Sequence, residues 1–132
     1  MQWVETRIRV RYGETDQMGH AYYANYLYWF EVARGEFCRS KGFTYKSLEA
    51  EGLFLPVVEV GVKYRGEIRY DDELIVRTRI AEIKRASIKF EYEIRRAGED
   101  ALLTEGFSWH VTMGPERKAV AVPGELRAKL ED

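Results

Sequence analysis

The residues best suited to chemistry lie in one short stretch, Tyr12-Gly-Glu-Thr-Asp-Gln-Met-Gly-His20, at a junction between two regular elements. Asp16 supplies a carboxylate, and Gly19 permits the tight backbone that such a junction needs. The first N–H groups of a helix have no partner within that helix, so they are free to polarise a carbonyl group. A carboxylate beside such amides predicts a compact site for attack on a carbonyl compound.

Two elements must position this junction. Upstream, apolar and charged residues alternate from Val4 to Arg11, with the period of a half-buried strand. Downstream, a broad apolar stripe that includes Phe30 and Phe37 recurs at helical spacing. We expect a helix over about Tyr26 to Lys41 that ends at Gly42.

The rest of the chain predicts one short helix and then strands. A helical piece over Tyr45 to Glu51 comes first, and a surface helix over Pro123 to Leu130 comes last. Between them, four stretches alternate apolar and polar residues: Phe54 to Arg65, Glu73 to Ile83, Ala86 to Arg95 and Leu103 to Met113. We interpret them as a meander of antiparallel strands. The expected fold is an α+β domain in which an antiparallel sheet of about five strands wraps around one long helix.

Length and composition favour a single cytoplasmic domain over residues 1–132. Lys and Arg number 21 against 22 Asp and Glu, and this net charge of -1 argues against a dedicated nucleic-acid binder. One cysteine, Cys38, excludes an intrachain disulfide and indicates a reducing compartment. No apolar stretch approaches the roughly 20 residues of a membrane-spanning helix, and the first residues lack a signal-peptide core. We therefore expect no stable membrane insertion.

A longer pattern surrounds the junction. It comprises Tyr12-x-x-Thr-Asp16-x-x-Gly19-His20, Asn25-Tyr26, Glu31-x-x-Arg34, Asp71-Asp72-x-Leu74 and Arg85-x-Ser87. This pattern resembles the hotdog-fold acyl-CoA thioesterases of the 4-hydroxybenzoyl-CoA thioesterase type, and it spans nearly the whole chain. The resemblance implies a dimer of hotdog protomers with two active sites at the subunit interface.

The resemblance also implies roles for residues. The acid at Asp16 attacks the thioester or activates water, and a backbone amide at about Tyr23 polarises the thioester carbonyl. Gly19, Asn25 and Tyr26 are expected to bind substrate. Because the coenzyme A thiolate is a tolerable leaving group and coenzyme A is part of the substrate, the reaction needs no metal and no further cofactor. The two His and one Cys show no metal-ligand spacing either.

Several of these residues have a structural alternative. Asp16 could be a turn or helix-capping residue, and as a catalyst it could be a nucleophile or a general base. His20 could orient Asp16 or be a satisfied structural residue, and one branch of relatives instead carries a His where this chain has Tyr23. Tyr12 could lend its hydroxyl to Asp16 or simply line the pocket. Asn25 is also an N-cap candidate.

Two further constellations compete with Asp16. Glu31 is a rival catalytic carboxylate, because some hotdog thioesterases take their acid from the central helix; otherwise it is expected to pair with Arg34 or with backbone near the dimer interface. Ser108 and His110 share one face of a strand, but this spacing occurs in any alternating strand, so a Ser-His-Asp triad is disfavoured.

Basic residues at strand ends are candidates for the phosphates of coenzyme A. They form two clusters, Lys63 with Arg65 and Lys84 with Arg85. Charge and bidentate contacts would bind phosphate there, although many such clusters are only solvated strand edges that deter aggregation.

The sequence thus predicts an acyl-CoA thioesterase that forms a homodimer or a homotetramer, since pairing removes an exposed sheet edge. Two alternatives remain open. One is a non-catalytic hotdog protein that binds an acyl or aromatic ligand, and the other is a thioesterase that acts on acyl carrier protein.

Overall fold

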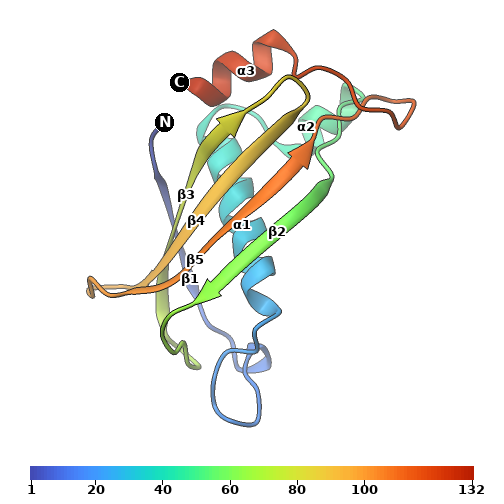
Figure 1. Ribbon diagram of the computed structural model, residues 1–132. Helices are drawn as coiled ribbons and strands as arrows, with labels where there is room; N and C mark the ends of the chain where they lie inside the picture. The colour runs from blue at the N-terminus through green and yellow to red at the C-terminus, as the bar shows by residue number, and fades with distance from the viewer.

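The computed structural model describes all residues from 1 to 132. One long helix lies against a five-stranded antiparallel sheet, with two short helices at one end (Figure 1). The elements are, in chain order, β1 (Val4–Arg9), a 3-10 turn (Tyr12–Glu14), α1 (Asn25–Ser40), α2 (Tyr45–Ala50), β2 (Val57–Tyr64), β3 (Glu73–Ile83), β4 (Ser87–Arg96), β5 (Leu102–Val111) and α3 (Gly124–Glu131).

The strand order in the sheet is β1-β3-β4-β5-β2, so the predicted four-strand meander is wrong in one respect. β3, β4 and β5 form a meander, but β2 pairs with β5 at one edge rather than with β3. The connection from β2 to β3 is therefore a crossover instead of a hairpin. Ile68 in this connection is fully buried and its carbonyl accepts the Ala21 N–H at 2.7 Å, which holds the crossover beneath the start of α1.

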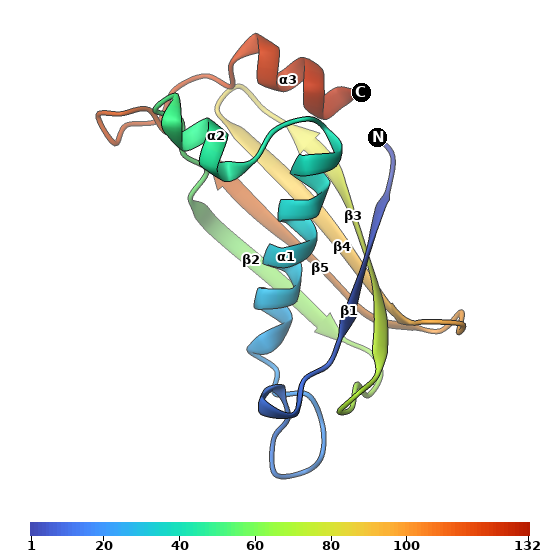
Figure 2. The same cartoon turned by 180° about the vertical axis from the view of Figure 1, so that it is seen from behind.

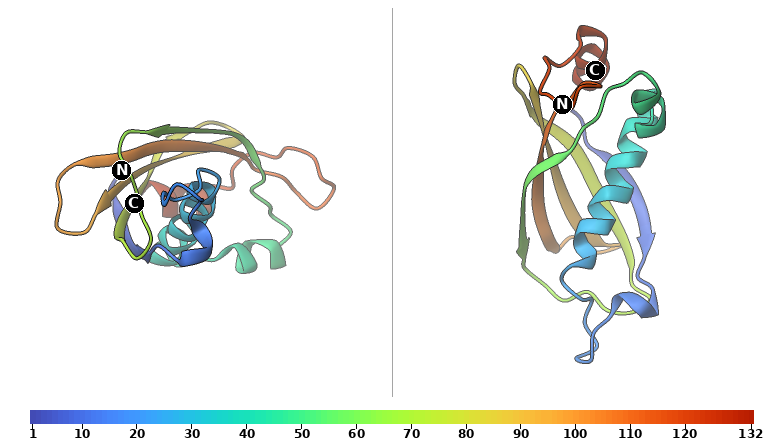
Figure 3. Two further views of the ribbon diagram at one scale, coloured as in Figure 1. Left: turned by 90° about the horizontal axis from the view of Figure 1, so that it is seen from below. Right: turned by 90° about the vertical axis from the view of Figure 1, so that its right-hand side faces the viewer.

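The sheet curves around α1, as the fold class predicts (Figures 2 and 3). The aromatic stripe of α1 packs on the inner face of the sheet, where Phe30 stacks on Tyr92 of β4 with 4.2 Å between ring centroids. A Cβ atom at Gly106 of β5 would lie 2.7 Å from the Phe30 ring, so this close approach requires glycine. Burial of these rings is the main force that fixes α1 on the sheet.

The sheet has two edges of different character. β1 carries alternating charges at Glu5, Arg7 and Arg9, a common device against edge pairing. β2 instead exposes apolar side chains, with Val58 at 60% and Val60 at 42% exposure. At the end of β2, Tyr64 contacts Tyr26 of α1, with 4.7 Å between ring centroids.

No helix of this protein is long and apolar enough to cross a membrane.

Candidate active site

The predicted junction is a small closed loop that projects beyond the end of the sheet where β2 ends (Figure 1). Thr15 and Ala21 form an antiparallel bridge, and the Asp16 N–H donates to the His20 carbonyl at 2.8 Å. Gly19 turns the chain with φ 83°, a left-handed conformation that favours glycine. The loop therefore presents Asp16 on a rigid backbone.

The Asp16 carboxylate is half-buried, and only one of its oxygens is used by the protein. Oδ1 accepts the backbone N–H of Met18 at 2.9 Å and that of His20 at 3.2 Å. Oδ2 accepts no hydrogen bond. One oxygen thus holds the loop together, and the other is free for a reaction.

The start of α1 leaves two backbone donors free. The Tyr22 N–H donates to the Glu14 carbonyl and the Asn25 N–H to the Tyr22 carbonyl, whereas the N–H groups of Tyr23 and Ala24 donate to no acceptor. Unpaired N–H groups at a helix N-terminus attract a developing negative charge. This geometry is what the predicted role of the Tyr23 amide requires.

Asn25 is not the N-cap that its residue type predicts. It is the first residue of α1, the N-cap position belongs to Ala24, and no side chain caps the helix there. The Asn25 Nδ2 instead donates to the Glu14 carbonyl at 2.9 Å. Its amide ties the helix start to the turn that precedes Asp16.

The side chain of His20 does not orient Asp16. Its Nε2 lies 2.8 Å from Glu67 Oε1 in the crossover, and only its backbone N–H and carbonyl bond to Asp16. Arg69 and, to a lesser extent, His20 lower the pKa of the exposed Glu67 carboxyl. His20 therefore fastens the loop to the crossover, where it also forms a backbone bridge with Arg69.

Tyr12 makes no hydrogen bond with Asp16. It is 78% exposed and meets Tyr70 edge to face at 5.6 Å. Tyr26 is buried, and this burial raises the pKa of its hydroxyl to about 12. Its ring contacts Tyr64, whose hydroxyl donates to the Tyr23 carbonyl at 3.1 Å. Tyr26 thus lies beneath the helix start rather than beside the free carboxylate oxygen.

Glu31 is exposed on α1 and does not pair with Arg34, contrary to that alternative. Arg34 is buried and donates from Nε to the Tyr45 hydroxyl at 2.6 Å and from Nη1 to the Tyr92 hydroxyl at 3.0 Å. Glu31 keeps its carboxylate free of ion pairs, so it stays a rival to Asp16.

Ser108 and His110 are hydrogen-bonded at 2.8 Å, but both are buried in the core, where no substrate reaches them. His110 Nδ1 must donate to the Leu55 carbonyl, so its Nε2 accepts from Ser108, which in turn accepts from Tyr92. Arg34 completes this chain by donating to Tyr92. The pair is part of a structural network.

This network makes a prediction about acid stability. Burial lowers the pKa of His110 from 6.5 to about 4. The unfolded chain therefore takes up a proton near pH 6.5, whereas the folded chain takes it up only near pH 4. The free energy of unfolding should fall by about 3 kcal/mol between these pH values from His110 alone, and this contribution is complete above pH 6.5.

Thermal unfolding at pH 7 and pH 4.5 measures this effect. His110→Gln, which cannot titrate, should lose less stability on acidification than the wild type. Ile94→Val, a change in the buried core that removes no titratable group, is the control and should keep the wild-type dependence. An equal acid sensitivity in His110→Gln and the wild type would show that His110 does not carry the effect.

The two basic clusters lie at opposite ends of the sheet. Arg127 of α3 donates to the Lys84 carbonyl at 2.8 Å and Val122 to the Arg85 carbonyl at 2.7 Å, at the end remote from Asp16 (Figure 1). Lys63 and Arg65 end β2 beside the site. The clusters therefore do not form one phosphate site within a protomer.

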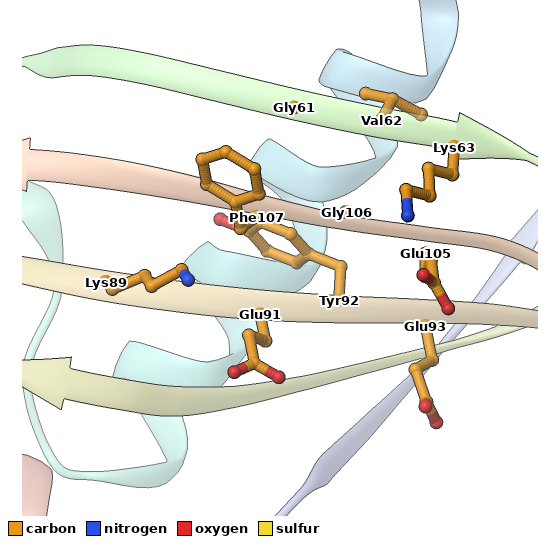
Figure 4. A pocket seen from close by; sticks show the side chains of 10 residues that line it. All are labelled: Gly61, Val62, Lys63, Lys89, Glu91, Tyr92, Glu93, Glu105, Gly106 and Phe107. Atoms are coloured by element: carbon orange, nitrogen blue, oxygen red, sulfur yellow. The ribbon is translucent and has the colours of Figure 1, made fainter.

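Lys63 lines a groove of about 500 Å³ on the outer face of the sheet (Figure 4). Lys89 and Phe107 line it as well, above the two glycines Gly61 and Gly106. Arg65 pairs with Glu105 of this groove at 3.0 Å, which lowers the pKa of that carboxyl. Lys63 has no carboxylate within ion-pair distance and is available to an anion.

Glu14 is a residue of the site that the sequence analysis did not single out. It is 6% exposed, which is rare for a carboxylate, and both of its oxygens accept hydrogen bonds. A signal was present, because Glu14 stands only two residues before Asp16 in the motif. Nothing in the sequence, however, marks it as buried.

Residues 10–130 match the protein family described as the thioesterase-like superfamily. The chain belongs to this family. A putative acyl-CoA thioesterase of Bacillus subtilis, YneP, is 37% identical over 110 residues, which cover 83% of this chain and 78% of that protein.

Solved structures of thioesterases share this fold. The DHNA-CoA thioesterase from Staphylococcus aureus has a TM-score of 0.91 at 30% identity, covering 99% of this chain and 92% of that one. A 4-hydroxybenzoyl-CoA thioesterase has a TM-score of 0.90 at 20% identity, covering 98% and 99%, and supports the fold alone. The predicted hotdog fold and family are thus confirmed, and the chain is a thioester hydrolase by family.

Proposed function

We propose that this protein hydrolyses acyl-CoA thioesters with Asp16 as the acting carboxylate and the Tyr23 N–H as the donor to the thioester carbonyl oxygen. One observation carries the proposal: the segment between β1 and α1 holds a carboxylate oxygen of Asp16 and, seven residues later at the start of the helix, the N–H of Tyr23, and neither has a partner. Relatives named as acyl-CoA thioesterases support the class of substrate.

Two chemical routes fit this arrangement. As a general base, Asp16 takes a proton from water, and the resulting hydroxide attacks the thioester carbon. As a nucleophile, Asp16 attacks the carbon itself and forms a mixed anhydride that water then hydrolyses. In both routes the electron pair of the broken carbon–sulfur bond leaves with the coenzyme A thiolate. The Tyr23 N–H stabilises the oxyanion of the tetrahedral intermediate.

A substrate panel tests the reaction. The purified protein is supplied with short, medium, long and aromatic acyl-CoAs and with the same acyl groups on acyl carrier protein, and free thiol is measured. We expect thiol release in step with free acid from acyl-CoA. Release from the carrier protein only would favour that substrate class, and no release from any thioester would favour a non-catalytic binding protein.

The free amine of Lys63 supports a second proposal, that the basic end of β2 contacts coenzyme A phosphates. Lys63→Ala and Arg65→Ala should each raise KM for acyl-CoA about 3- to 10-fold, as expected for loss of one charge-assisted contact. KM for the matching acyl-pantetheine, which lacks the nucleotide, should stay unchanged. Lys46→Ala, an exposed change on α2, is the control. Equal effects on both substrates would exclude phosphate contacts.

The apolar edge at β2 supports assembly into a homodimer, with further pairing into a tetramer open to measurement. A second copy that pairs along β2 would remove this edge and cover Val58 and Val60. Tyr64 at the end of the same strand contacts Tyr23, so such an interface would border the proposed active site.

A further inference from the structure

Glu14 connects the end of β1, the loop that carries Asp16 and the start of α1. Its Oε1 accepts the Arg11 backbone N–H at 2.7 Å, and its Oε2 accepts the indole N–H of Trp29 at 3.1 Å and an Arg11 guanidinium N–H at 3.3 Å. Arg11 follows β1, and Trp29 lies in the second turn of α1. One buried carboxylate thus joins the end of a strand to the helix.

The backbone of the same residue holds the helix start. The Glu14 carbonyl accepts the Tyr22 N–H at 2.8 Å and the Asn25 Nδ2 at 2.9 Å. Tyr23, with its free N–H, lies between these two anchored residues. From the other side, the Tyr64 hydroxyl donates to the Tyr23 carbonyl at 3.1 Å. The free amide is therefore held from both sides.

Glu14 also controls where Asp16 lies, because only Thr15 separates them. The Thr15 hydroxyl and N–H both return to the Tyr12 carbonyl, at 2.7 and 3.2 Å, so the 3-10 turn leaves little freedom between the two acids. Glu14 cannot itself attack substrate, since both carboxylate oxygens are occupied and its side chain is 8% exposed.

We propose that Glu14 is a positioning residue, which through Trp29 and its own carbonyl sets the free Asp16 oxygen and the free Tyr23 N–H in one fixed frame. This inference rests on the proposed function. Attack on a carbonyl requires the two groups to act on a single thioester, and a misplacement of about 1 Å costs roughly 10²-fold in rate.

Two conservative changes test this role. Glu14→Gln keeps the shape but removes the charge and one acceptor oxygen, and Trp29→Phe keeps a buried ring but removes the donor. Each should lower kcat about 10- to 100-fold, with KM for acyl-CoA changed less than about 2-fold. Trp3→Phe is the matched control for loss of an indole N–H, because Trp3 packs on Arg77 and Arg79, away from the loop.

A general loss of stability must be separated from lost positioning. Ile88→Val removes one methylene group from the core at the end of the sheet remote from the loop, and it should lower the unfolding temperature without lowering kcat. Hydrogen exchange of the backbone amides in residues 12–26 gives a readout that needs no activity. Both loop variants should speed exchange there, whereas Trp3→Phe and Ile88→Val should not.

The outcomes are distinct. Faster loop exchange together with a kcat loss confined to Glu14→Gln and Trp29→Phe supports the positioning role. Unchanged exchange, unchanged kcat, or an equal kcat loss in Ile88→Val overturns it. Failure of the proposed function is seen in a different variant: Asp16→Asn would then still hydrolyse thioesters.

Discussion

Asp16→Asn is expected to fold normally and to lose about 10²- to 10⁴-fold in kcat, the range typical of a carboxylate that acts as base or nucleophile. The asparagine Oδ1 can still accept the N–H groups of Met18 and His20, which hold the loop closed. Only the second oxygen, which accepts no hydrogen bond, is replaced by an NH2 group that can act neither as a base nor as a nucleophile. Thiol release under saturating acyl-CoA measures kcat, and circular dichroism checks the fold.

Glu31→Gln is the matched control, because it makes the same change in the rival carboxylate on α1. It should keep most of the activity. If Asp16→Asn is fully active while Glu31→Gln is inactive, the catalytic carboxylate is on the helix, and the free oxygen of Asp16 has no chemical role.

The second large effect concerns assembly. Light scattering of the wild type should give at least twice the 15.5 kDa chain mass at low micromolar concentration. Val60→Lys places a charge on the exposed apolar edge at β2 and should shift the protein toward monomer, because lysine on an edge opposes strand pairing. Activity should fall at least about 10-fold with it, since the proposed interface borders Tyr23.

Val120→Lys is the control for this change, because Val120 is also an exposed valine but lies in the segment between β5 and α3 and not on the β2 edge. It should leave mass and activity unchanged. An active monomer, either in the wild type or in Val60→Lys, would mean that the site is complete within one chain.

The elements of this fold could be predicted from the sequence because their signals are local. The alternation that predicts a strand over Glu73 to Ile83 gives the observed bounds of β3, and α1 begins one residue before the expected Tyr26. The strand order could not be predicted in this way. It depends on the crossover that buries Ile68 against Ala21, two residues far apart in the chain.

In the candidate site too, local properties could be predicted and tertiary contacts could not. Gly19 adopts the left-handed backbone that its type predicts, since this is a property of one residue. The partners of His20 and Arg34 could not be predicted, because Glu67 and Tyr92 reach them only through tertiary packing. Asn25 shows the same limit, since its residue type favours a cap but its Nδ2 donates to the carbonyl of Glu14, 11 residues earlier in the chain.

A crystal structure of the Asp16→Asn variant with uncleaved acyl-CoA tests the central claim most directly. We predict that the thioester carbonyl oxygen lies about 2.7–3.1 Å from the Tyr23 nitrogen, with the carbonyl carbon facing the side chain at position 16. A thioester bound with its carbonyl away from the start of α1, and with the Tyr23 N–H still unpaired, would contradict it.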